Sequence, residues 1–547
     1  MSDPQHQWRS SYRAAALIAA VTLPQFLLGL GDRNIWIPLE ARYALVAREM
    51  LEAGHWLLPS LGGEVYADKP PLLFWSIAFI SVLGSGVTEW TARLPTALAA
   101  VGVCLVTWQL GVRLFSPTTG LLAALVLATS GGFFWSGRQA LPDMLLTLWT
   151  TGAFWALWEW FTGKHRQAVI AVGVCMGFAT LTKGPVGVVL PSLFGLIYLL
   201  VRRQRPTLWG RDVLLCFGAF LGVTLSWFAP AVALGGLEYA QATLLHHSLE
   251  RYVRAWEHTA PWYFYLGAFP AEFLPWTLFL PQALGAGVRL RRPQGHDGWW
   301  FALCWLVTIL VFFSISSGKR DIYILPAFPA AALLVGWSWS CWWQHPTNAV
   351  SVWAIRLPTF GLALTFWGLA VGIWGSVDGF LPTRNTLLLP ATPEMGVWAS
   401  LLLVLAGTLL GSAAITQRTR LVYGCLVGCT WMAMLMTVVW VYTPQFNRRY
   451  PIKSFAAEVQ AQVAQDTPLQ LCGPMNDLAL RFNLGRFVPA LRQTSDVIHY
   501  LERDEEGFCV IEAEGYQRLG ERTGRFFPIV ARQEVDRLTL LLISNRW

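Results

Sequence analysis

Runs of about 20 apolar residues, the length that crosses a bilayer, recur along most of this 547-residue chain and constrain its fold more than any other feature. Only 13% of the residues are charged, whereas a soluble globular protein carries about 25%. The 30 tryptophans and 31 phenylalanines suit a chain that meets the membrane interface many times. The sequence therefore predicts a polytopic α-helical membrane protein and excludes a disordered chain, a collagen, a coiled coil and a disulfide scaffold.

Thirteen of these runs are expected to cross the membrane. They lie near residues 14–30, 94–114, 119–137, 144–161, 168–182, 185–201, 212–234, 271–288, 299–316, 322–342, 353–376, 396–416 and 421–442. The first run resembles a signal peptide but lacks a convincing cleavage site, so we interpret it as an uncleaved helix with a cytoplasmic N-terminus.

The positive-inside rule decides how a further apolar run, at 71–84, is counted. If this run does not cross, the basic clusters all fall in the cytoplasm, at 164–166, 202–205, 289–292 and 418–420. We therefore expect 71–84 to lie along the outer leaflet or dip into it. An odd number of crossings places the C-terminus in the periplasm.

The tail has a different composition from the rest of the chain. Amphipathic, helix-like stretches are expected at Ile452–Gln465 and Ser495–Glu502, and short apolar strands at Leu469–Cys472, Cys509–Glu512 and Leu538–Ile543. This alternation predicts a small periplasmic α/β domain.

The predicted boundaries divide the chain into two domains. Residues 1–444 form the transmembrane domain, with periplasmic loops at 31–93, which carries interfacial helices, and at 235–270; residues 445–547 form the α/β domain. An oxidising periplasm would allow Cys472 and Cys509 to pair, but we expect two buried free thiols.

The net charge of +8 does not indicate nucleic-acid binding, because the basic residues form no long contiguous run and instead follow the expected topology. The nine cysteines include no CxxC motif and no Cys/His cluster, which argues against a zinc site of the usual kind.

A second set of charges lies on the outer side, against the positive-inside rule. It comprises Glu40, Arg42, Arg48, Asp68, Lys69, Arg138, Asp143, Lys183, Arg251, Arg254, Lys319 and Arg320. Any one of these cations could simply extend to lipid phosphates, but they recur in most outer loops and have carboxylates among them. The set predicts a cavity that holds a phosphate-bearing lipid at the outer leaflet.

The local patterns around these charges are weak one at a time. Each could have a purely structural role. Asp143 could simply cap a helix, Lys183 could simply belong to a Lys-Gly-Pro turn, and His246 could simply be a polar loop residue. The two prolines that follow Lys69 would hold its ammonium group at the membrane edge.

In their order along the chain, these segments resemble the GT-C superfamily of membrane glycosyltransferases, in its protein O-mannosyltransferase-like group, and most of all the lipid A aminoarabinose transferases. The resemblance covers about residues 10–345. It rests on the segments Glu40–Ala44, Arg48–Met50, Asp68–Pro71, Arg138–Asp143, Thr182–Pro185, His246–Arg251, Pro261–Tyr263 and Lys319–Pro326.

The resemblance implies a GT-C fold and an enzyme of the bacterial inner membrane whose site faces the periplasm. It would move a sugar, 4-amino-4-deoxy-L-arabinose, from undecaprenyl phosphate to a lipid A phosphate or a related glycolipid, by an inverting displacement. The expected partners are these lipids and the membrane, without nucleic acid, and the expected state is a monomer.

Three alternatives remain open. One is a protein O-mannosyltransferase-like enzyme with another polyprenyl phosphate sugar or acceptor. The others are a transporter of lipid-linked sugars and a non-catalytic lipid-binding protein.

The resemblance also implies roles for individual residues. The donor phosphate would be bound by Lys69, Arg251, Arg42 and Tyr323. The cavity would be lined by Tyr43, Tyr66, Arg138, Lys183 and Arg254. The catalytic carboxylates would be Asp143 and Glu40. No cofactor is expected to be required, although Asp68 and His246 would be the ligands of a divalent metal ion if one binds.

One position departs from the family, in which an acidic residue precedes Glu40; here that residue is Leu39. Glu40 could turn inward to replace it, the chemistry could proceed without it, or the substrate or the activity could have changed. A phosphate acceptor fits this departure better than a hydroxyl acceptor, because a nucleophile that is already an anion needs little general-base help.

Overall fold

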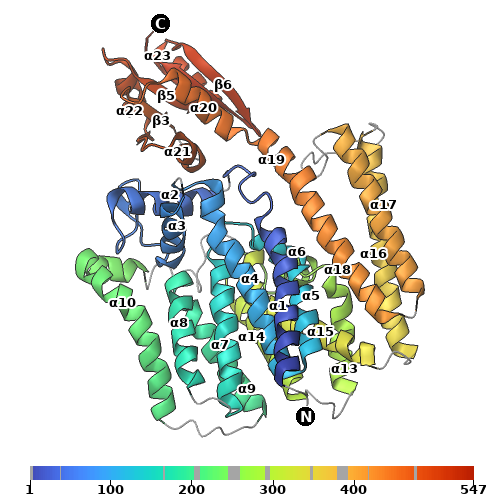
Figure 1. Ribbon diagram of the computed structural model, residues 1–547. Coiled ribbons are helices and arrows are strands. Elements are labelled where there is room, and N and C mark those ends of the chain that lie inside the picture. The colour runs from blue at the N-terminus through green and yellow to red at the C-terminus, as the bar shows by residue number, and fades with distance from the viewer. Residues whose placement is uncertain are drawn as a thin grey trace.

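Apolar helices dominate the chain up to Arg449, and a small α/β domain follows them (Figure 1). The computed structural model describes residues 4–36, 38–84, 86–163, 167–202, 210–243, 259–289, 296–344, 349–377, 392–416, 418–473 and 477–546.

The helical part begins with α1 (Pro4–Leu27), α2 (Pro38–Ala53), the hairpin β1 (Ser60–Leu61) and β2 (Glu64–Val65), α3 (Leu72–Val82), α4 (Glu89–Leu114), α5 (Pro117–Ala128), α6 (Gly131–Ser136), α7 (Asp143–Phe161), α8 (Ala168–Lys183), α9 (Val186–Arg202) and α10 (Arg211–Gln241). It continues with α12 (Phe264–Glu272), η2 (Trp276–Phe279), α13 (Leu280–Arg289), α14 (His296–Ile315), η3 (Asp321–Ala327), α15 (Phe328–Gln344), α16 (Ala349–Val377), α17 (Pro393–Ile415), α18 (Thr419–Met436), the π-helical segment η5 (Thr437–Tyr442) and α19 (Thr443–Arg449).

Seven helical segments in the described part of the chain are long and apolar enough to cross a membrane. They are Glu89–Leu114, Arg211–Gln241, Asp297–Ile315, Asp321–Trp343, Ala354–Gly375, Pro393–Ile415 and Thr419–Arg449. Two of the expected crossings are divided: the run 119–137 forms α5 and α6, and the run 271–288 forms the end of α12, η2 and α13. Helical membrane-protein character is thus confirmed, whereas the count of thirteen crossings stays a prediction.

The run 71–84 forms α3, which has 11 residues. At 1.5 Å per residue it extends about 16 Å, roughly half of a hydrocarbon core about 30 Å thick. This length agrees with a helix that does not cross on its own.

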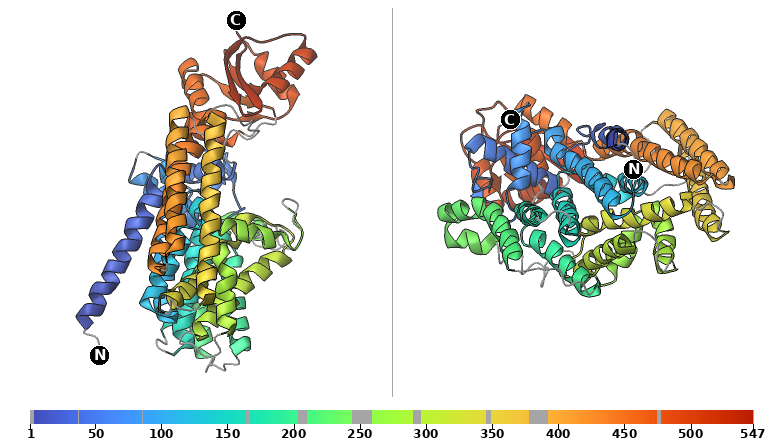
Figure 2. Two further views of the ribbon diagram at one scale, coloured as in Figure 1. Left: turned by 90° about the vertical axis from the view of Figure 1, so that its right-hand side faces the viewer. Right: turned by 60° about the horizontal axis from the view of Figure 1, so that its bottom comes forward.

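The two ends of the bundle carry different parts of the chain. The start of α1 lies at one end, while α2, α3 and the α/β domain lie together at the other, and the left view of Figure 2 shows the same separation (Figures 1 and 2). The structure therefore brings the first loop and the tail to a shared end, as the predicted topology requires.

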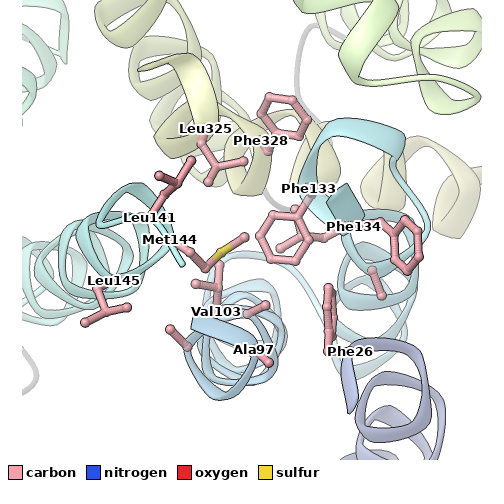
Figure 3. Packing of buried hydrophobic residues seen from close by; sticks show 14 of the residues in the cluster. Phe26, Ala97, Val103, Phe133, Phe134, Leu141, Met144, Leu145, Leu325 and Phe328 are labelled. Atoms are coloured by element: carbon pink, nitrogen blue, oxygen red, sulfur yellow. The ribbon is translucent and has the colours of Figure 1, made fainter. Parts of the chain in front are cut away.

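Apolar side chains pack between the helices of the bundle (Figure 3). Phe26 of α1, Phe133 of α6 and Met144 of α7 are at most 1% exposed and pack with residues of α4, η3 and α15. The Phe26 ring packs directly against the Gly137 backbone, because a Cβ on Gly137 would lie only 2.6 Å from that ring. This packing fixes the segment that leads into α7.

The tail folds as α20 (Ile452–Gln462), β3 (Leu469–Cys472), α21 (Leu478–Leu484), β4 (Ala490–Leu491), α22 (Thr494–Leu501), β5 (Phe508–Glu512), α23 (Ala513–Thr523), β6 (Ile529–Val535) and β7 (Leu538–Ser544). The strand order is β4-β3-β5-β7-β6. β3 is parallel to β4 and β5, and β7 is antiparallel to β5 and β6. The two expected helices and three expected strands are confirmed within a few residues.

Cys472 and Cys509 form a disulfide, so the expectation of two free thiols is wrong. In the parallel register of β3 and β5, Cys509 lies opposite Gln470, two residues before Cys472. Residues two apart on a strand share a face, so the thiols are diagonal neighbours. Their Cα atoms are 6.1 Å apart, within the range that a disulfide spans.

The α/β domain contacts the first loop directly. Arg48 of α2 donates to the Phe482 carbonyl oxygen at 2.8 Å, with its guanidinium 4.6 Å from the Phe482 ring centroid. Lys453 of α20 pairs with Glu89, at the start of α4, at 3.0 Å. These contacts give Arg48 a structural role between the two domains.

Candidate active site

Two tyrosines of the first loop are held by α3. The ring centroids of Tyr43, on α2, and Tyr66, after β2, lie 5.8 and 5.9 Å from that of Phe74. Burial raises the pKa of Tyr43, and the nearby charge of Asp143 raises it further; burial likewise raises the pKa of Tyr66. Both phenols therefore stay protonated at neutral pH and can donate a hydrogen bond.

A charged group lies beside these rings. Arg42 Nη1 is 3.6 Å from Asp68 Oδ2, and the Tyr66 hydroxyl donates to the same oxygen at 3.4 Å. Lys69 Nζ donates to the Asp68 carbonyl oxygen at 2.9 Å. One third of the Arg42 side chain is exposed, so a ligand can reach it.

Three helix ends bring Asp143, Lys183 and Tyr323 together, although the sequence separates them by many residues. Asp143 is the first residue of α7, and its carboxylate pairs with the ammonium of Lys183, the last residue of α8. That ammonium also lies 4.2 Å from the ring centroid of Tyr323 on η3. The alternative in which Asp143 only caps a helix is not supported, because no side chain caps the start of α7 and this carboxylate binds Lys183 instead; the catalytic role of Asp143 stays a prediction.

The turn after Lys183 is made possible by glycine. Gly184 adopts φ +78°, a conformation that side-chain-bearing residues rarely adopt, and it ends α8 directly after Lys183. A Cβ on Gly187 would lie 2.3 Å from the Ala179 backbone, so α9 turns back tightly against α8. The Lys-Gly-Pro segment is thus a turn, and the turn itself orients the lysine.

The segment before η3 adds another cation, Arg320. The Tyr265 hydroxyl accepts the Arg320 N–H at 3.3 Å and donates to its carbonyl oxygen at 3.0 Å, which fixes the backbone there. The neighbouring Lys319 donates to the carbonyl oxygen of Ala260 at 3.0 Å, so it is used structurally. Neither Tyr265 nor the separate roles of these two cations followed from sequence reasoning.

Tyr43 lies near both groups of charges, since, beyond the larger effect of burial, Asp143 and Asp68 raise its pKa while Arg42 and Arg320 lower it. We call Tyr43, Arg42, Tyr66, Asp68, Lys69, Asp143, Lys183, Arg320 and Tyr323 the Tyr43 cluster. It has four cations and two carboxylates, so it carries an excess of positive charge. Such a site favours anionic ligands.

Glu40 is placed differently from the other expected catalytic carboxylate. It is fully buried, and its oxygens accept hydrogen bonds from Arg33 (2.8 Å), Arg93 (3.0 and 3.2 Å) and the Ala140 N–H (3.0 Å). Burial alone would raise the pKa of Glu40, but Arg33 and Arg93 lower it to about 2. These bonds occupy both carboxylate oxygens, which disfavours one of the three alternatives for position 39, namely that Glu40 turns inward to replace the missing acid.

Arg138 also differs from its expected place in the cavity lining. It is buried, and its guanidinium donates to the carbonyl oxygens of Gln25 (2.7 Å) and Leu28 (2.6 Å). The last carbonyls of a helix lack intrahelical partners, so Arg138 caps the C-terminal end of α1.

Three expected site residues, Arg251, Arg254 and His246, lie outside the described residues. Within the described ranges, no three His, Cys, Asp or Glu side chains gather as a metal site would require. The carboxylate of Asp68, the other expected metal ligand, already faces Arg42 and Tyr66. The metal ion that Asp68 and His246 would hold therefore stays a prediction.

The comparisons with known proteins agree on the fold. Residues 68–233 match the family described as dolichyl-phosphate-mannose-protein mannosyltransferase. The crystal structure of ArnT from Cupriavidus metallidurans bound to undecaprenyl phosphate superposes with a TM-score of 0.80 at 22% identity, covering 97% of this chain and 98% of that chain. The same protein in the apo state gives a TM-score of 0.79 at 21% identity, with 97% of each chain covered.

Curated relatives match over a shorter segment. The chain is 33% identical over 317 residues to the undecaprenyl phosphate-alpha-4-amino-4-deoxy-L-arabinose arabinosyl transferase of Pseudomonas aeruginosa (strain LESB58), with 57% of each chain covered. It is 34% identical over 333 residues to the protein of that name from Pseudomonas savastanoi pv. phaseolicola (strain 1448A / Race 6), covering 60% of this chain and 61% of that one. The chain thus spans less than two thirds of the length of these relatives, resembles the dolichyl-phosphate-mannose-protein mannosyltransferase family over residues 68–233, and has the fold of ArnT.

Proposed function

We propose that this protein is a glycosyltransferase that moves 4-amino-4-deoxy-L-arabinose from undecaprenyl phosphate to a phosphate of lipid A. The observation that carries the proposal is the excess of positive charge in the Tyr43 cluster, because this reaction brings a donor phosphate and an acceptor phosphate to one site. The relatives' names supply the sugar and the polyprenyl carrier.

The leaving phosphate is the first requirement of the chemistry. Arg42 and Lys69 both contact Asp68, and Tyr323 lies beside Lys183, so we assign these three side chains to the donor phosphate. The bond from the anomeric carbon to the donor phosphate oxygen breaks, and these donors stabilise the negative charge that develops on that oxygen. Arg251 would join them.

The acceptor supplies the electron pair. A lipid A phosphate oxygen attacks the anomeric carbon from the opposite face, which inverts the configuration there. Because this nucleophile is an anion, no side chain has to remove a proton from it. Leu39 in place of an acid is therefore compatible with turnover.

Asp143 is the carboxylate that we assign to the substrate. It has the charge to bind the amino group of the sugar, and Lys183 holds it at the start of α7. Glu40 is assigned a positioning role instead, since its oxygens are already bound to protein donors.

An apolar groove of about 420 Å³ between α9 and α14 suits the polyprenyl tail. Its lining residues run from Val201 and Trp300 to Ile315, toward the end of the bundle where Lys183 and Tyr323 lie. We therefore place the protein in the inner membrane with its site at the periplasmic face. It acts as a monomer with thirteen crossings and a periplasmic α/β domain, and no step of the reaction requires a metal ion.

The test is transfer in a defined system. Purified full-length protein in detergent is given undecaprenyl phosphate-linked 4-amino-4-deoxy-L-arabinose and lipid A, and mass spectrometry follows the acceptor. We expect lipid A to gain one aminoarabinose residue. A Ser/Thr peptide and a polyprenyl phosphate mannose are run in parallel as alternative acceptor and donor.

The alternatives give different results in this system or in vesicles that contain the protein. Glycosylation of the peptide without modification of lipid A would overturn the proposed acceptor. Movement of the donor across the membrane of vesicles that contain the protein, without transfer of its sugar to an acceptor, would indicate a transporter. Donor binding with neither activity would indicate a lipid-binding protein.

A further inference from the structure

Arg33, Glu40 and Arg93 form a buried cluster of three charges that does not belong to the Tyr43 cluster. Arg93 Nε lies 3.0 Å from Glu40 Oε1 and its Nη2 lies 3.2 Å from Oε2, while Arg33 Nη2 is 2.8 Å from Oε2. Their side chains are at most 6% exposed. Two guanidinium groups thus share one carboxylate away from water.

The cluster is bonded to the backbone on two sides. Arg93 Nη1 donates to the Leu30 carbonyl oxygen, after the end of α1, at 2.9 Å. On the other side, Glu40 Oε1 accepts the Ala140 N–H at 3.0 Å. Ala140 lies three residues before Asp143, in the segment that leads into α7. The three charges therefore join α2 and α4 to the backbone that carries Asp143.

The cluster also reaches α19, the helix that leads into the α/β domain. The Arg33 guanidinium lies 5.3 Å from the Phe446 ring centroid and 5.5 Å from that of Trp135. The neighbouring Asn34 N–H donates to Asn447 Oδ1 at 2.8 Å. Several elements thus fix the position of the Arg33–Glu40–Arg93 cluster.

Stability alone does not explain such a group. Removing charges from water is unfavourable, and a well-packed apolar set often stabilises a core equally well. A guanidinium, however, presents its N–H donors in a rigid planar fork, so it fixes the direction of the carboxylate that it binds. Here the fixed carboxylate in turn fixes one backbone N–H near the site.

We propose that Arg33, Glu40 and Arg93 are positioning residues that hold the segment 137–142 through the Ala140 N–H and thereby aim the Asp143 carboxylate. This inference rests on the proposed function in one respect, namely that Asp143 acts on the substrate. It gives the acid at position 40 a role that does not depend on the residue at position 39, which is Leu.

The first test does not depend on activity. Hydrogen–deuterium exchange of the full-length protein in detergent is measured for peptides that contain the Ala140 amide. Glu40→Gln removes the charge but keeps the shape, so we expect the Ala140 amide to exchange about tenfold faster or more. The matched control is Glu49→Gln on the same helix, whose carboxylate binds the Gly62 N–H at 2.6 Å, and it should leave this amide unchanged.

The second test uses the transfer assay. A displaced carboxylate should reduce kcat by about 10- to 100-fold, while the KM for the donor and the pH profile stay as in the wild type. In an Asp143→Asn background, Glu40→Gln should cause no further loss, because the two residues act through one carboxylate. Glu49→Gln should turn over normally.

The outcomes separate this inference from the proposed function. Unchanged exchange at Ala140 in Glu40→Gln, or additive losses in the double variant, would overturn the positioning role. Faster exchange at Ala140 in Glu40→Gln, together with a wild-type protein that transfers no sugar, would instead overturn the proposed function. If Glu40→Gln is not recovered folded, Arg33→Gln leaves the Arg93–Glu40 pair in place and should shift exchange in the same direction by less; no shift would refute the inference.

Discussion

Replacing Asp143 with Asn removes one negative charge from the Tyr43 cluster while keeping the size of the side chain. The carboxylate and the Lys183 ammonium are only 7% and 14% exposed, so water and salt screen their interaction weakly. In the variant the ammonium loses its partner and remains near the Tyr323 ring. We expect Asp143→Asn to lose most of the transfer activity and to remain folded.

The size of the loss follows from this burial. Breaking a buried ion pair by removing one partner costs about 3 kcal/mol or more. If that interaction orders the site in the transition state, kcat falls by about 100-fold, since each 1.36 kcal/mol corresponds to a factor of ten. A capping role would give a different result, because Asn caps a helix about as well as Asp.

The assay is the initial rate of aminoarabinose transfer to lipid A, measured for Asp143→Asn, Lys183→Met and the double variant. If the pair acts as a unit, the double variant should lose at least about 1 kcal/mol less than the sum of the single losses. Asp297→Asn is the matched control. Asp297 also lies in the first turn of a helix and pairs with a cation on a neighbouring helix, Arg202, at the opposite end of the bundle.

Two results would refute this reasoning. Wild-type turnover by Asp143→Asn would show that the charge is not needed, and only the phosphate-binding part of the proposed function would remain. An equal loss in Asp297→Asn would show that the assay reports general damage to the helix ends.

Four further predictions follow from separate features. Lys69→Ala should lose one charge-assisted contact worth about 1.5–3 kcal/mol and reduce activity by about 10- to 100-fold, with Lys69→Arg retaining part of it; wild-type rates in Lys69→Ala would contradict donor binding by this lysine. The folded-state pKa of Glu40 is lowered to about 2, so its ionised carboxylate contributes about 3 kcal/mol to the free energy of unfolding at neutral pH. This contribution is lost as the pH falls from about 5 to 2. Between pH 7 and pH 3, the Tm of Glu40→Gln should therefore decrease less than the Tm of the wild type. Maleimide labelling of the denatured protein should modify seven thiols before reduction and all nine after it, and nine before reduction would contradict the Cys472–Cys509 disulfide. In intact cells, a cysteine introduced at Ser495 should react with a membrane-impermeant maleimide and one at Thr162 should not, and the reverse would invalidate the topology.

Much of the fold was predictable because its information is local. A run of apolar residues becomes a membrane helix wherever it lies, since its backbone must form its own hydrogen bonds in lipid. The tail was equally predictable. Strand β3 has the expected bounds, Leu469–Cys472, because a strand and a helix have different periodicities that can be distinguished within a few residues. The interruption of the run 119–137 at Ser130 was not apparent from apolarity alone, although two glycines follow there.

The candidate site was predictable in part. The order of charged segments indicated Arg42, Lys69, Asp143 and Lys183, and the structure brings each of them close to another member of the Tyr43 cluster or its neighbours. The buried partners Arg33 and Arg93 were missed, although Arg93 directly precedes an apolar run, where a cation is unusual unless it has a partner.

The sequence by itself determined that this chain forms apolar helices with a mixed α/β tail, and which outer segments carry charge. Only the tertiary structure decided how those charges pair. Glu40 and Asp143 are both carboxylates near a helix start, yet one is enclosed by Arg33 and Arg93 and the other meets Lys183, 40 residues away. Which cation each carboxylate meets depends on how its helix is rotated and packed against its neighbours. Ionic attraction depends on the distance between side chains in space and not on their separation along the sequence.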